Sequence, residues 1–389
     1  MRDELLGRPA KDQDFVVPGV GYEELREALA PHGRVEDLEV AGRRVGLRLY
    51  PNDRALRSLA PAGIEFAPPR TERSTGPGRH DFEIVASPEI SLQQDMARRD
   101  FTINAIAKRL ETGELLDPFG GQDDLRARVL RTVSPDSFRE DPLRLVRGLR
   151  FVSEHDLDPD EQTVAQMREN ADSVGLVSAE RVGGGLSADG MGELSKLLLG
   201  THPAKALRLA AETDVLGELL PELQADDFAV VQATADAGDP LAVRLAALLR
   251  ELDAETTRAV LRRLRYPTRL VRRVARAVEG RREPVPDAEP LTARRTLARY
   301  GEETALDVAR VRLAAGDDAA RTWLGALEGA SGAPHRVADL AIDGGDLREL
   351  GLAEGPRVGE VLATLLERVV DDPSLNTRDR LIEQAKELV

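Results

Sequence analysis

Two aspartates near the start of the chain have the spacing of a metal-binding pair. The segment Lys11-Asp-Gln-Asp-Phe-Val-Val ends in β-forming residues, so we expect a strand on which Asp12 and Asp14 point to the same face. Two carboxylates on a rigid strand are suitable ligands for a Mg²⁺ ion that also contacts triphosphate oxygens. In two-metal phosphoryl transfer, such ions hold the attacking and the leaving oxygen. Two solvated loop acids would have the same pattern, so the pair alone leaves both interpretations open.

A third carboxylate, Glu65, lies in the alternating segment Ile64-Glu-Phe. Its two apolar neighbours face one side of the expected strand, so Glu65 must face the other. If a neighbouring strand carries the aspartate pair, all three acids share one face of a sheet and Glu65 is a candidate catalytic residue. A strand residue that simply faces solvent fits the pattern equally well.

Adjacent arginines occur in the segment DMARRDFTINAIA, residues 95–107. We expect Arg98 and Arg99 to open an apolar helix, where their guanidinium forks could bind phosphate oxygens bidentately. The alternative is a capped helix with surface arginines.

Further arginines recur every third residue in the segment EDPLRLVRGLRF. Asp141 fits the N-cap of a helix and Pro142 its first position. Arg144, Arg147 and Arg150 then lie on one slowly drifting face. Asp141 and Arg144 together could offer an acceptor and a donor to a nucleobase edge, whereas the alternative is an arginine stripe that faces water or acids of the preceding domain.

The composition is that of a folded protein with 389 residues, 41% apolar and 32% charged. The absence of cysteine excludes disulfides and thiolate metal sites, and no apolar run approaches the ~20 residues of a membrane span. We therefore expect a cytoplasmic protein without a membrane partner or an evident obligate protein partner. The net charge of −15 argues against a polyanionic partner only on average, because residues 258–282 hold ten arginines and one acid.

The pattern of elements changes from mixed to helical along the chain. Strands are expected at residues 14–18, 43–50 and 63–67, a helix at 21–32, and a mobile loop at 68–80 (PPRTERSTGPGRH). After Asp141 helical spacing continues almost to the end. Its clearest stretches are residues 204–219, 241–252, 256–264, 269–278 and 358–370.

Four segments together resemble the superfamily of class II tRNA nucleotidyltransferases (CCA-adding) and bacterial poly(A) polymerases. They are KDQDFVV, RRDFTINAIA, the turn segment DPFGGQDDLRARVLR and EDPLRLVRGLRF, in the order and spacing of that superfamily. The resemblance implies an α/β (α+β) nucleotidyltransferase head with a small mixed sheet, followed by a long all-α neck, body and tail. The expected domains are 1–131 (head), 132–225 (neck), 226–335 (body) and 336–389 (a tail that binds tRNA).

The same resemblance implies a role for individual residues. Asp12 and Asp14 match the pair that binds Mg²⁺. Nucleotide-binding roles fall on Arg2, Arg99, Arg147 and Arg150, and on Asp141 with Arg144, which match the pair that reads the base of CTP or ATP. The loop at residues 68–80 matches the segment implicated in the switch from C to A addition.

The arginine-rich segment suggests how RNA is held. The candidates are Arg262, Arg265, Arg269, Arg272, Arg273 and Arg276, which recur at near-helical spacing and could follow an RNA backbone by positive charge alone. The alternative is a pair of arginine-rich helices neutralised by nearby acids.

Two departures from the superfamily pattern qualify this interpretation. Members begin this region with a strand that ends in two glycines, whereas this chain begins Met1-Arg-Asp-Glu-Leu-Leu-Gly. Our hypothesis is a misassigned start, because a GUG valine codon can initiate as methionine. None of the five histidines forms a His-Asp pair in the C-terminal half, so no phosphohydrolase activity is expected.

We therefore predict a template-independent nucleotidyltransferase that adds CCA to the 3′ end of tRNA from CTP and ATP and releases pyrophosphate. A poly(A) polymerase, or an enzyme that adds only CC or only A, is the nearest alternative. A non-catalytic RNA-binding protein is the alternative from another class.

Overall fold

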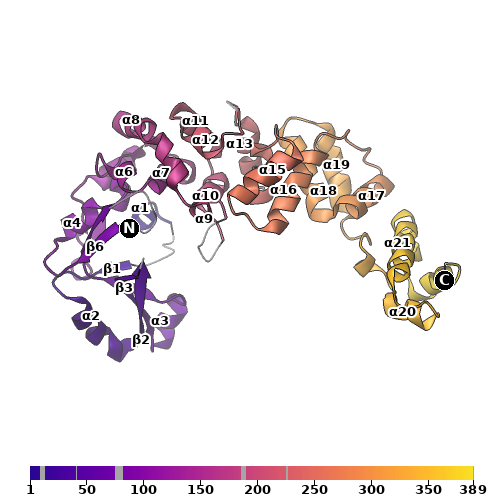
Figure 1. Ribbon diagram of the computed structural model, residues 1–389, viewed down its shortest axis with the longest axis horizontal. Coiled ribbons are helices and arrows are strands. Elements are labelled where there is room, and N and C mark those ends of the chain that lie inside the picture. Colours follow the sequence, from indigo (N-terminus) through magenta and orange to yellow (C-terminus); the bar gives the residue numbers. More distant parts are fainter. Residues whose placement is uncertain (9–13, 41, 75–81, 185–189, 225–226, 389) are drawn as a thin grey trace. The chain divides into compact units, whose positions relative to one another are not determined.

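The computed structural model describes residues 1–8, 14–40, 42–74, 82–184, 190–224 and 227–388 (Figure 1). The chain divides into two compact units, Met1–Pro221 and Glu222–Val389. This division lies close to the expected boundary between neck and body, and the other expected boundaries stay predictions. Within the described part of the chain, no helix combines the length and apolarity that a membrane span requires.

A small mixed sheet opens the first unit, as predicted. Its strand order is β1 (Asp14–Val16), β4 (Ile64–Ala67), β3 (Arg43–Pro51) and β2 (Gly33–Val40). The pairing of β1 with β4 is parallel and the other two pairings are antiparallel. Helix α2 (Tyr22–Leu29) covers one face (Figure 1), where Leu25 and Leu29 pack with Leu47 and Leu49. Because strand residues alternate, the polar residues between these apolar ones face the other side of the sheet.

Residues 70–74 are a strand, which corrects the loop expected over residues 68–80. Strand β5 (Arg70–Ser74) pairs antiparallel with β6 (Phe82–Ala86). The local composition gave no sign of this strand, because it depends on a partner further along the chain that is rich in β-formers. Of the rest of the expected loop, Pro68 and Pro69 are described, whereas residues 75–80 lie outside the described residues.

The adjacent arginines end a helix rather than open one, which is a second correction. Helix α4 (Leu92–Ala97) begins at a capping box between Ser91 and Gln94, and Arg98 is its C-cap. The apolar segment that follows forms only a 3₁₀ turn, η2 (Thr102–Asn104). The capping box fixes the helix start six residues earlier than the arginines, so the phase of the helix was misjudged.

The rest of the first unit is mainly helical. Helix α7 (Leu143–His155) is its centre and packs against α10 (Glu193–Leu199) and α11 (Pro203–Glu212). The other elements are α1 (Arg2–Leu5), η1 (Ala30–His32), α3 (Arg54–Leu59), β7 (Ala107–Lys108), β8 (Leu115–Leu116), α5 (Gly121–Ala127), β9 (Val129–Leu130), α6 (Ser137–Glu140), β10 (Asp158–Pro159), α8 (Glu161–Glu169), η3 (Ala171–Leu176), α9 (Ala179–Val182) and α12 (Val215–Leu219).

The second unit contains helices throughout its described residues. They are α13 (Ala229–Asp236), α14 (Leu241–Leu248), α15 (Ala254–Arg263), α16 (Thr268–Gly280), α17 (Pro290–Tyr300), α18 (Glu302–Ala314), α19 (Ala319–Ala330), η4 (Val337–Asp339), α20 (Gly344–Glu349), α21 (Pro356–Asp371), η5 (Pro373–Leu375) and α22 (Arg378–Lys386). The helical stretches predicted after Asp141 are therefore confirmed. The last helices share a core of their own around Leu347, Leu365 and Leu381.

Candidate active site

The acidic side of the site is the face of the sheet opposite α2. Asp14 and Glu65 are register partners of the parallel strands β1 and β4, so their side chains lie next to each other on one face. Asp14 is exposed, and Glu65 binds Arg48 of the neighbouring strand. Asp12 lies outside the described residues. The sheet thus brings Glu65 beside the second aspartate, as the alternation in the sequence predicted.

Mg²⁺ prefers carboxylate oxygens, and this face supplies them. Asp14 and Glu65 offer two such groups on adjacent strands of a rigid sheet. Within the described ranges no group of three or more potential metal-binding side chains occurs. The donor chemistry of this face therefore fits Mg²⁺, and metal binding by Asp14 stays a prediction.

Arg98 and Arg99, which follow helix α4, both contact Asp95, a buried acid of that helix. Asp95 is 1% exposed and accepts from Arg98 Nη2 at 3.0 Å, and Arg99 Nη2 lies 3.9 Å from its other oxygen. Burial lowers the pKa of Arg99, whereas Asp95, Asp100 and Asp14 counteract this effect. Arginine stays charged despite such a shift. Arg99 is thus a partly exposed cation within electrostatic range of the acidic strand β1.

Asp100 is a second buried acid, and it organises the loop after Arg99. It accepts from the backbone N of Phe101 (2.9 Å), from Asn104 Nδ2 (2.8 Å) and from Arg147 Nε (2.9 Å). Burial alone would raise its pKa, but Arg147 and these hydrogen bonds lower the pKa of Asp100 overall. Asn104 Oδ1 in turn accepts from Arg2 Nη1 at 2.9 Å. Asp100 thereby connects two of the predicted nucleotide-binding arginines.

Three of the predicted arginines surround one buried aromatic ring. The guanidinium carbons of Arg2, Arg150 and Arg147 lie 4.7, 4.4 and 5.7 Å from the centre of the Phe151 ring. Glu193 at the start of α10 forms ion pairs with Arg150 (2.9 Å) and Arg147 (3.5 Å). Burial favours a lower pKa for Arg147, but Asp100 and Glu193 raise the pKa of Arg147 overall. The cluster holds several cations in fixed positions, which suits a polyphosphate.

Helix α7 begins one residue later than predicted, with Pro142 rather than Asp141 at its N-cap, and Asp141 is the last residue before it. The backbone of Asp141 is extended while Pro142 already has helical angles (φ −57°, ψ −22°), and Asp141 Oδ1 accepts from the backbone N of Leu143 at 3.1 Å. Its other oxygen accepts from Arg181 Nη2 at 3.2 Å. One oxygen of the Asp141 carboxylate therefore binds the start of α7, and the other binds Arg181 of α9. The sequence did not suggest Arg181 as a partner.

The guanidinium of Arg144 forms hydrogen bonds with other protein groups. Its side chain is 11% exposed, and Nη1 donates to the backbone O of Ser137 (3.2 Å) and to Glu140 Oε2 (3.0 Å). Nη2 donates to the backbone O of Arg98 at 2.7 Å. Base recognition by Asp141 and Arg144 thus stays a prediction, and it requires that Arg144 exchange some of these hydrogen bonds for the base.

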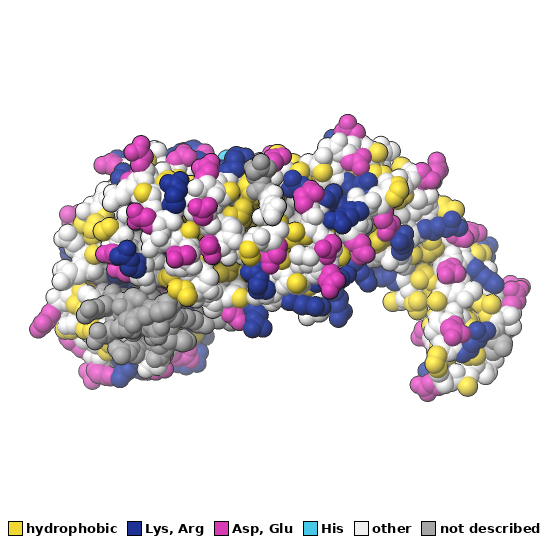
Figure 2. Space-filling model, turned by 45° about the horizontal axis from the view of Figure 1, so that its top comes forward, with side chains coloured by type: hydrophobic (Ala, Val, Ile, Leu, Met, Phe, Trp, Pro, Cys, Tyr) yellow, Lys and Arg dark blue, Asp and Glu magenta, His cyan; other side chains and the backbone are white. Residues whose placement is uncertain are grey.

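The arginines predicted to bind RNA lie on α15, on α16 and in the turn between them. Arg262, Arg265, Arg269, Arg272 and Arg276 are exposed. Arg273 instead forms a forked ion pair with the buried Asp307, through Nε (2.5 Å) and Nη2 (2.8 Å). Figure 2 shows Lys and Arg side chains gathered along the lower side of this helical part.

The sequence did not identify four of the residues that organise the site. Asp100, Asn104, Glu193 and Arg181 each contact a predicted residue. Asp100 and Asn104 lay inside a quoted segment, where polar residues among apolar ones could have marked them. Glu193 and Arg181 carried no local signal, because their partners are 40 or more residues away in the chain.

A mixed sheet with two adjacent carboxylates and a cluster of arginines held by buried acids occur in the same unit, which is the combination of groups that a nucleotidyltransferase needs. Three family models match the chain: the poly A polymerase head domain at residues 1–131, a probable RNA and SrmB-binding site of polymerase A at 156–227, and a putative tRNA nucleotidyltransferase domain 2 at 242–385. The first match covers the sheet and the acidic residues, and the third covers α16.

The chain belongs to the family of CCA-adding enzymes. It is 34% identical over 274 residues to the CCA-adding enzyme of Pseudomonas putida (strain W619), an alignment that covers 69% of this chain and 67% of that protein. It is 37% identical over 280 residues to the multifunctional CCA protein of Chromobacterium violaceum, which covers 67% of this chain and 62% of the relative. The chain thus spans less than two thirds of the length of the latter protein.

The fold is also similar to that of a solved member. The crystal structure of the Bacillus stearothermophilus CCA-adding enzyme in complex with CTP matches with a TM-score of 0.73 and 28% identity. The match covers 99% of this chain and 90% of that one. The similarity therefore extends through the head and the helical units.

Proposed function

We propose that this protein is a template-independent nucleotidyltransferase that adds CCA to the 3′ end of tRNA, using CTP and ATP and releasing pyrophosphate. The observation that carries the proposal is the position of Arg99, within electrostatic range of Asp14 and bonded to the loop that also holds Arg2. A carboxylate that could hold a metal thus acts electrostatically on one of the cations that could hold a triphosphate. The family and its CTP-bound member support the same assignment.

The reaction needs positioning and charge stabilisation more than covalent catalysis. The 3′-hydroxyl oxygen of the RNA attacks the α-phosphorus of the nucleotide, its proton leaves, and the bond to pyrophosphate breaks. Arg2, Arg147 and Arg150 are fixed by Phe151 and Glu193, so they can bind triphosphate oxygens without further ordering. Bound Mg²⁺ would make the hydroxyl more acidic and neutralise phosphate charge, and Asp12 and Asp14 would hold it.

Selection between nucleotides falls to the start of α7. Asp141 offers an acceptor and Arg144 a donor, and their backbones are already linked by a hydrogen bond of 2.9 Å from Arg144 N to Asp141 O. Arg181, which binds Asp141, fixes the orientation of the carboxylate. Protein side chains would then read the base in place of a template strand.

The test uses a tRNA that lacks its terminal CCA, with Mg²⁺ and with CTP and ATP supplied separately and together. Growth by three nucleotides that requires both, and that is lost in Asp14→Asn, would support the proposal. Glu36→Gln is the matched control, because Glu36 lies on the same sheet but pairs with β3 instead of β4. A stop after two nucleotides, addition of A alone or a long A tail would assign one of the sibling activities, and binding without extension would indicate an RNA-binding protein.

A further inference from the structure

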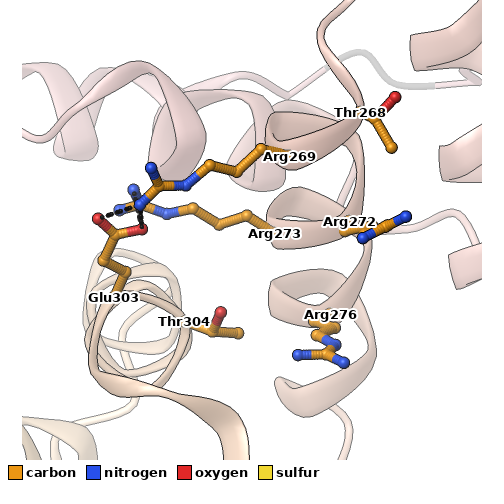
Figure 3. Close-up of a pocket in the computed structure, with 7 residues that line it drawn as sticks. All are labelled: Thr268, Arg269, Arg272, Arg273, Arg276, Glu303 and Thr304. Atoms are coloured by element: carbon orange, nitrogen blue, oxygen red, sulfur yellow. Dashed lines mark hydrogen bonds and ion pairs between the residues drawn. The ribbon is translucent and has the colours of Figure 1, made fainter. Parts of the chain in front are cut away.

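A groove of about 500 Å³ lies between helices α16 and α18 of the second unit (Figure 3). Its lining consists of Thr268, Arg269, Arg272, Arg273, Arg276, Glu303 and Thr304. Four of the seven residues are arginines and one is an acid. The lining contains no aromatic side chain on which a nucleobase could stack, so the groove suits an anion rather than a whole nucleotide.

The carboxylate of Glu303 lies in this groove, where two of the arginines contact it. Arg269 Nη2 lies 3.0 and 3.1 Å from its two carboxylate oxygens, and Arg273 Nη1 lies 3.1 Å from one of them. Figure 3 shows both arginines reaching from α16 towards this carboxylate. Two guanidinium groups that converge on a pair of oxygens form the arrangement that also binds a phosphate.

The two arginines that contact Glu303 differ in exposure and in their other partners. Arg273 is anchored by the buried Asp307 and keeps that partner whether or not Glu303 is present. The side chain of Arg269 is 83% exposed, and Glu303 is 53% exposed. An exposed ion pair of this kind contributes only about 0–1 kcal/mol. A phosphate that brings the field of a whole polyanion can therefore replace Glu303 at Arg269.

Two further arginines extend the groove along α16. Arg272 and Arg276 are exposed, and neither has a hydrogen bond or ion pair within the part of the chain that the structure describes. Positions 269, 272 and 276 follow the i, i+3, i+7 spacing of one helix face. Arg272 and Arg276 add two exposed cations to Arg269, so the groove could contact more than one phosphate of an RNA strand.

We propose that this groove binds the sugar–phosphate backbone of RNA and that Glu303 stands in for one phosphate until the RNA displaces it. The inference rests on the proposed function in taking the RNA to be tRNA. Arg269, Arg272 and Arg276 contact the backbone, while Arg273 stays with Asp307. Glu303 is an internal competitor that weakens binding, so that contacts elsewhere are needed for a stable complex and the extended RNA is released more readily.

The test is equilibrium binding of fluorescently labelled tRNA lacking CCA, by anisotropy, without nucleotide and over a series of salt concentrations. Glu303→Gln should bind about three- to tenfold more tightly at ~0.15 M salt, because the phosphate no longer competes with a carboxylate. Arg272→Gln/Arg276→Gln should bind at least about tenfold more weakly, with a salt slope smaller by about one to two. The matched control is Glu222→Gln, which removes the partner of Arg263 (2.8 Å) outside the groove and changes the net charge equally.

Two outcomes would overturn the inference: Glu303→Gln binding like the wild type, or Glu222→Gln tightening the complex as much as Glu303→Gln. Thermal unfolding of each variant checks its fold, and Glu303→Ala serves as a second variant if Gln disturbs it. The extension assay on the same proteins separates this inference from the proposed function. Groove-dependent binding without extension would contradict only the function, and extension with unchanged Glu303→Gln binding would contradict only the groove.

Discussion

At the scale of single residues, the site depends on buried acids that hold arginines in place. Asp100 accepts hydrogen bonds from Asn104 and Arg147, and Asn104 accepts one from Arg2. A guanidinium held in this way loses little conformational freedom when a triphosphate binds, so more of the contact energy stabilises the transition state. The acids therefore act on the reaction through the arginines that they position.

Asp100→Asn should lower the free energy of unfolding by about 3 kcal/mol, because the variant removes the closer of the two buried counter-ions of Arg147. The KM for CTP should also rise, since Arg147 is then held by Glu193 alone. Chemical denaturation and steady-state kinetics measure the two effects. Asp136→Asn is the control, because Asp136 pairs with Arg139 on the surface, and the stability of this variant should change by no more than about 0.5 kcal/mol.

His155 should make stability depend on pH. Burial, together with Arg2 and Arg8, lowers the pKa of His155 to about 4, and Arg8 Nη1 contacts its Nδ1 at 2.7 Å. Between pH 6.5 and 4 the unfolded chain binds a proton that the folded protein does not, so stability falls as the pH falls through this range. The full effect amounts to about 3 kcal/mol.

The measurement is the difference in unfolding free energy between wild type and His155→Gln at several pH values. The difference should shrink as the pH is lowered from 7 to 4. His32→Gln, at an exposed histidine outside the cluster of His155, Arg2 and Arg8, is the control. A constant difference for His155→Gln would show that the histidine titrates equally in both states.

At the scale of elements, local patterns predicted most of the fold. The alternation of Asp14-Phe-Val and Ile64-Glu-Phe identified two strands and placed Glu65 on the right face, and helical spacing identified α7 and α16. Strand β5 was not predicted, because its pairing with β6 is not encoded in the local sequence. The phase of α4 was misjudged because its capping box precedes the arginines that drew attention.

The site was predicted less completely than the fold, for a related reason. The spacing of the arginines of α7 identified them in the sequence, but no local pattern identified the acids that hold them. Glu193 lies 46 residues after Arg147, and Arg181 lies 40 residues after Asp141. Which residues become partners depends on how the helices pack, and this packing cannot be read from local patterns in one sequence.

Helix α7 can approach Phe101 closely because residue 148 is glycine. A Cβ at Gly148 would lie 2.9 Å from Cζ of the Phe101 ring, which is itself buried between Phe138 and Phe151. Gly148→Ala should therefore destabilise the first unit by about 1–2 kcal/mol, despite the better helix propensity of alanine. Gly217→Ala in α12 is the control.

A Cβ at Gly217 has nothing within 4 Å, so this substitution should be neutral or stabilise by up to about 1 kcal/mol. Thermal unfolding of both variants tests the contrast. Equal effects would mean that the packing of α7 on Phe101 tolerates the extra methyl group.

At the scale of the whole molecule, the charges are divided between two tasks. The net charge is −15, yet three of the arginines predicted to bind nucleotide lie around Phe151 in the first unit, and the arginines predicted to bind RNA lie on α15, on α16 and in the turn between them in the second unit. The net negative charge disfavours RNA over the protein as a whole, so binding would depend on local groups of arginines. Nucleotide and RNA would thus be held by separate sets of cations in separate units.

This separation predicts additive effects on catalysis. Arg99→Gln should mainly raise the KM for CTP, and Arg276→Gln mainly the KM for tRNA, because the two residues lie in different units and share no partner among the described residues. The double variant should lose kcat/KM by the sum of the single losses, within about 0.5 kcal/mol. The measurement is a double-mutant cycle under saturating and limiting concentrations of each substrate. A coupling above about 1 kcal/mol would indicate that RNA bound along α16 changes how the first unit holds its nucleotide.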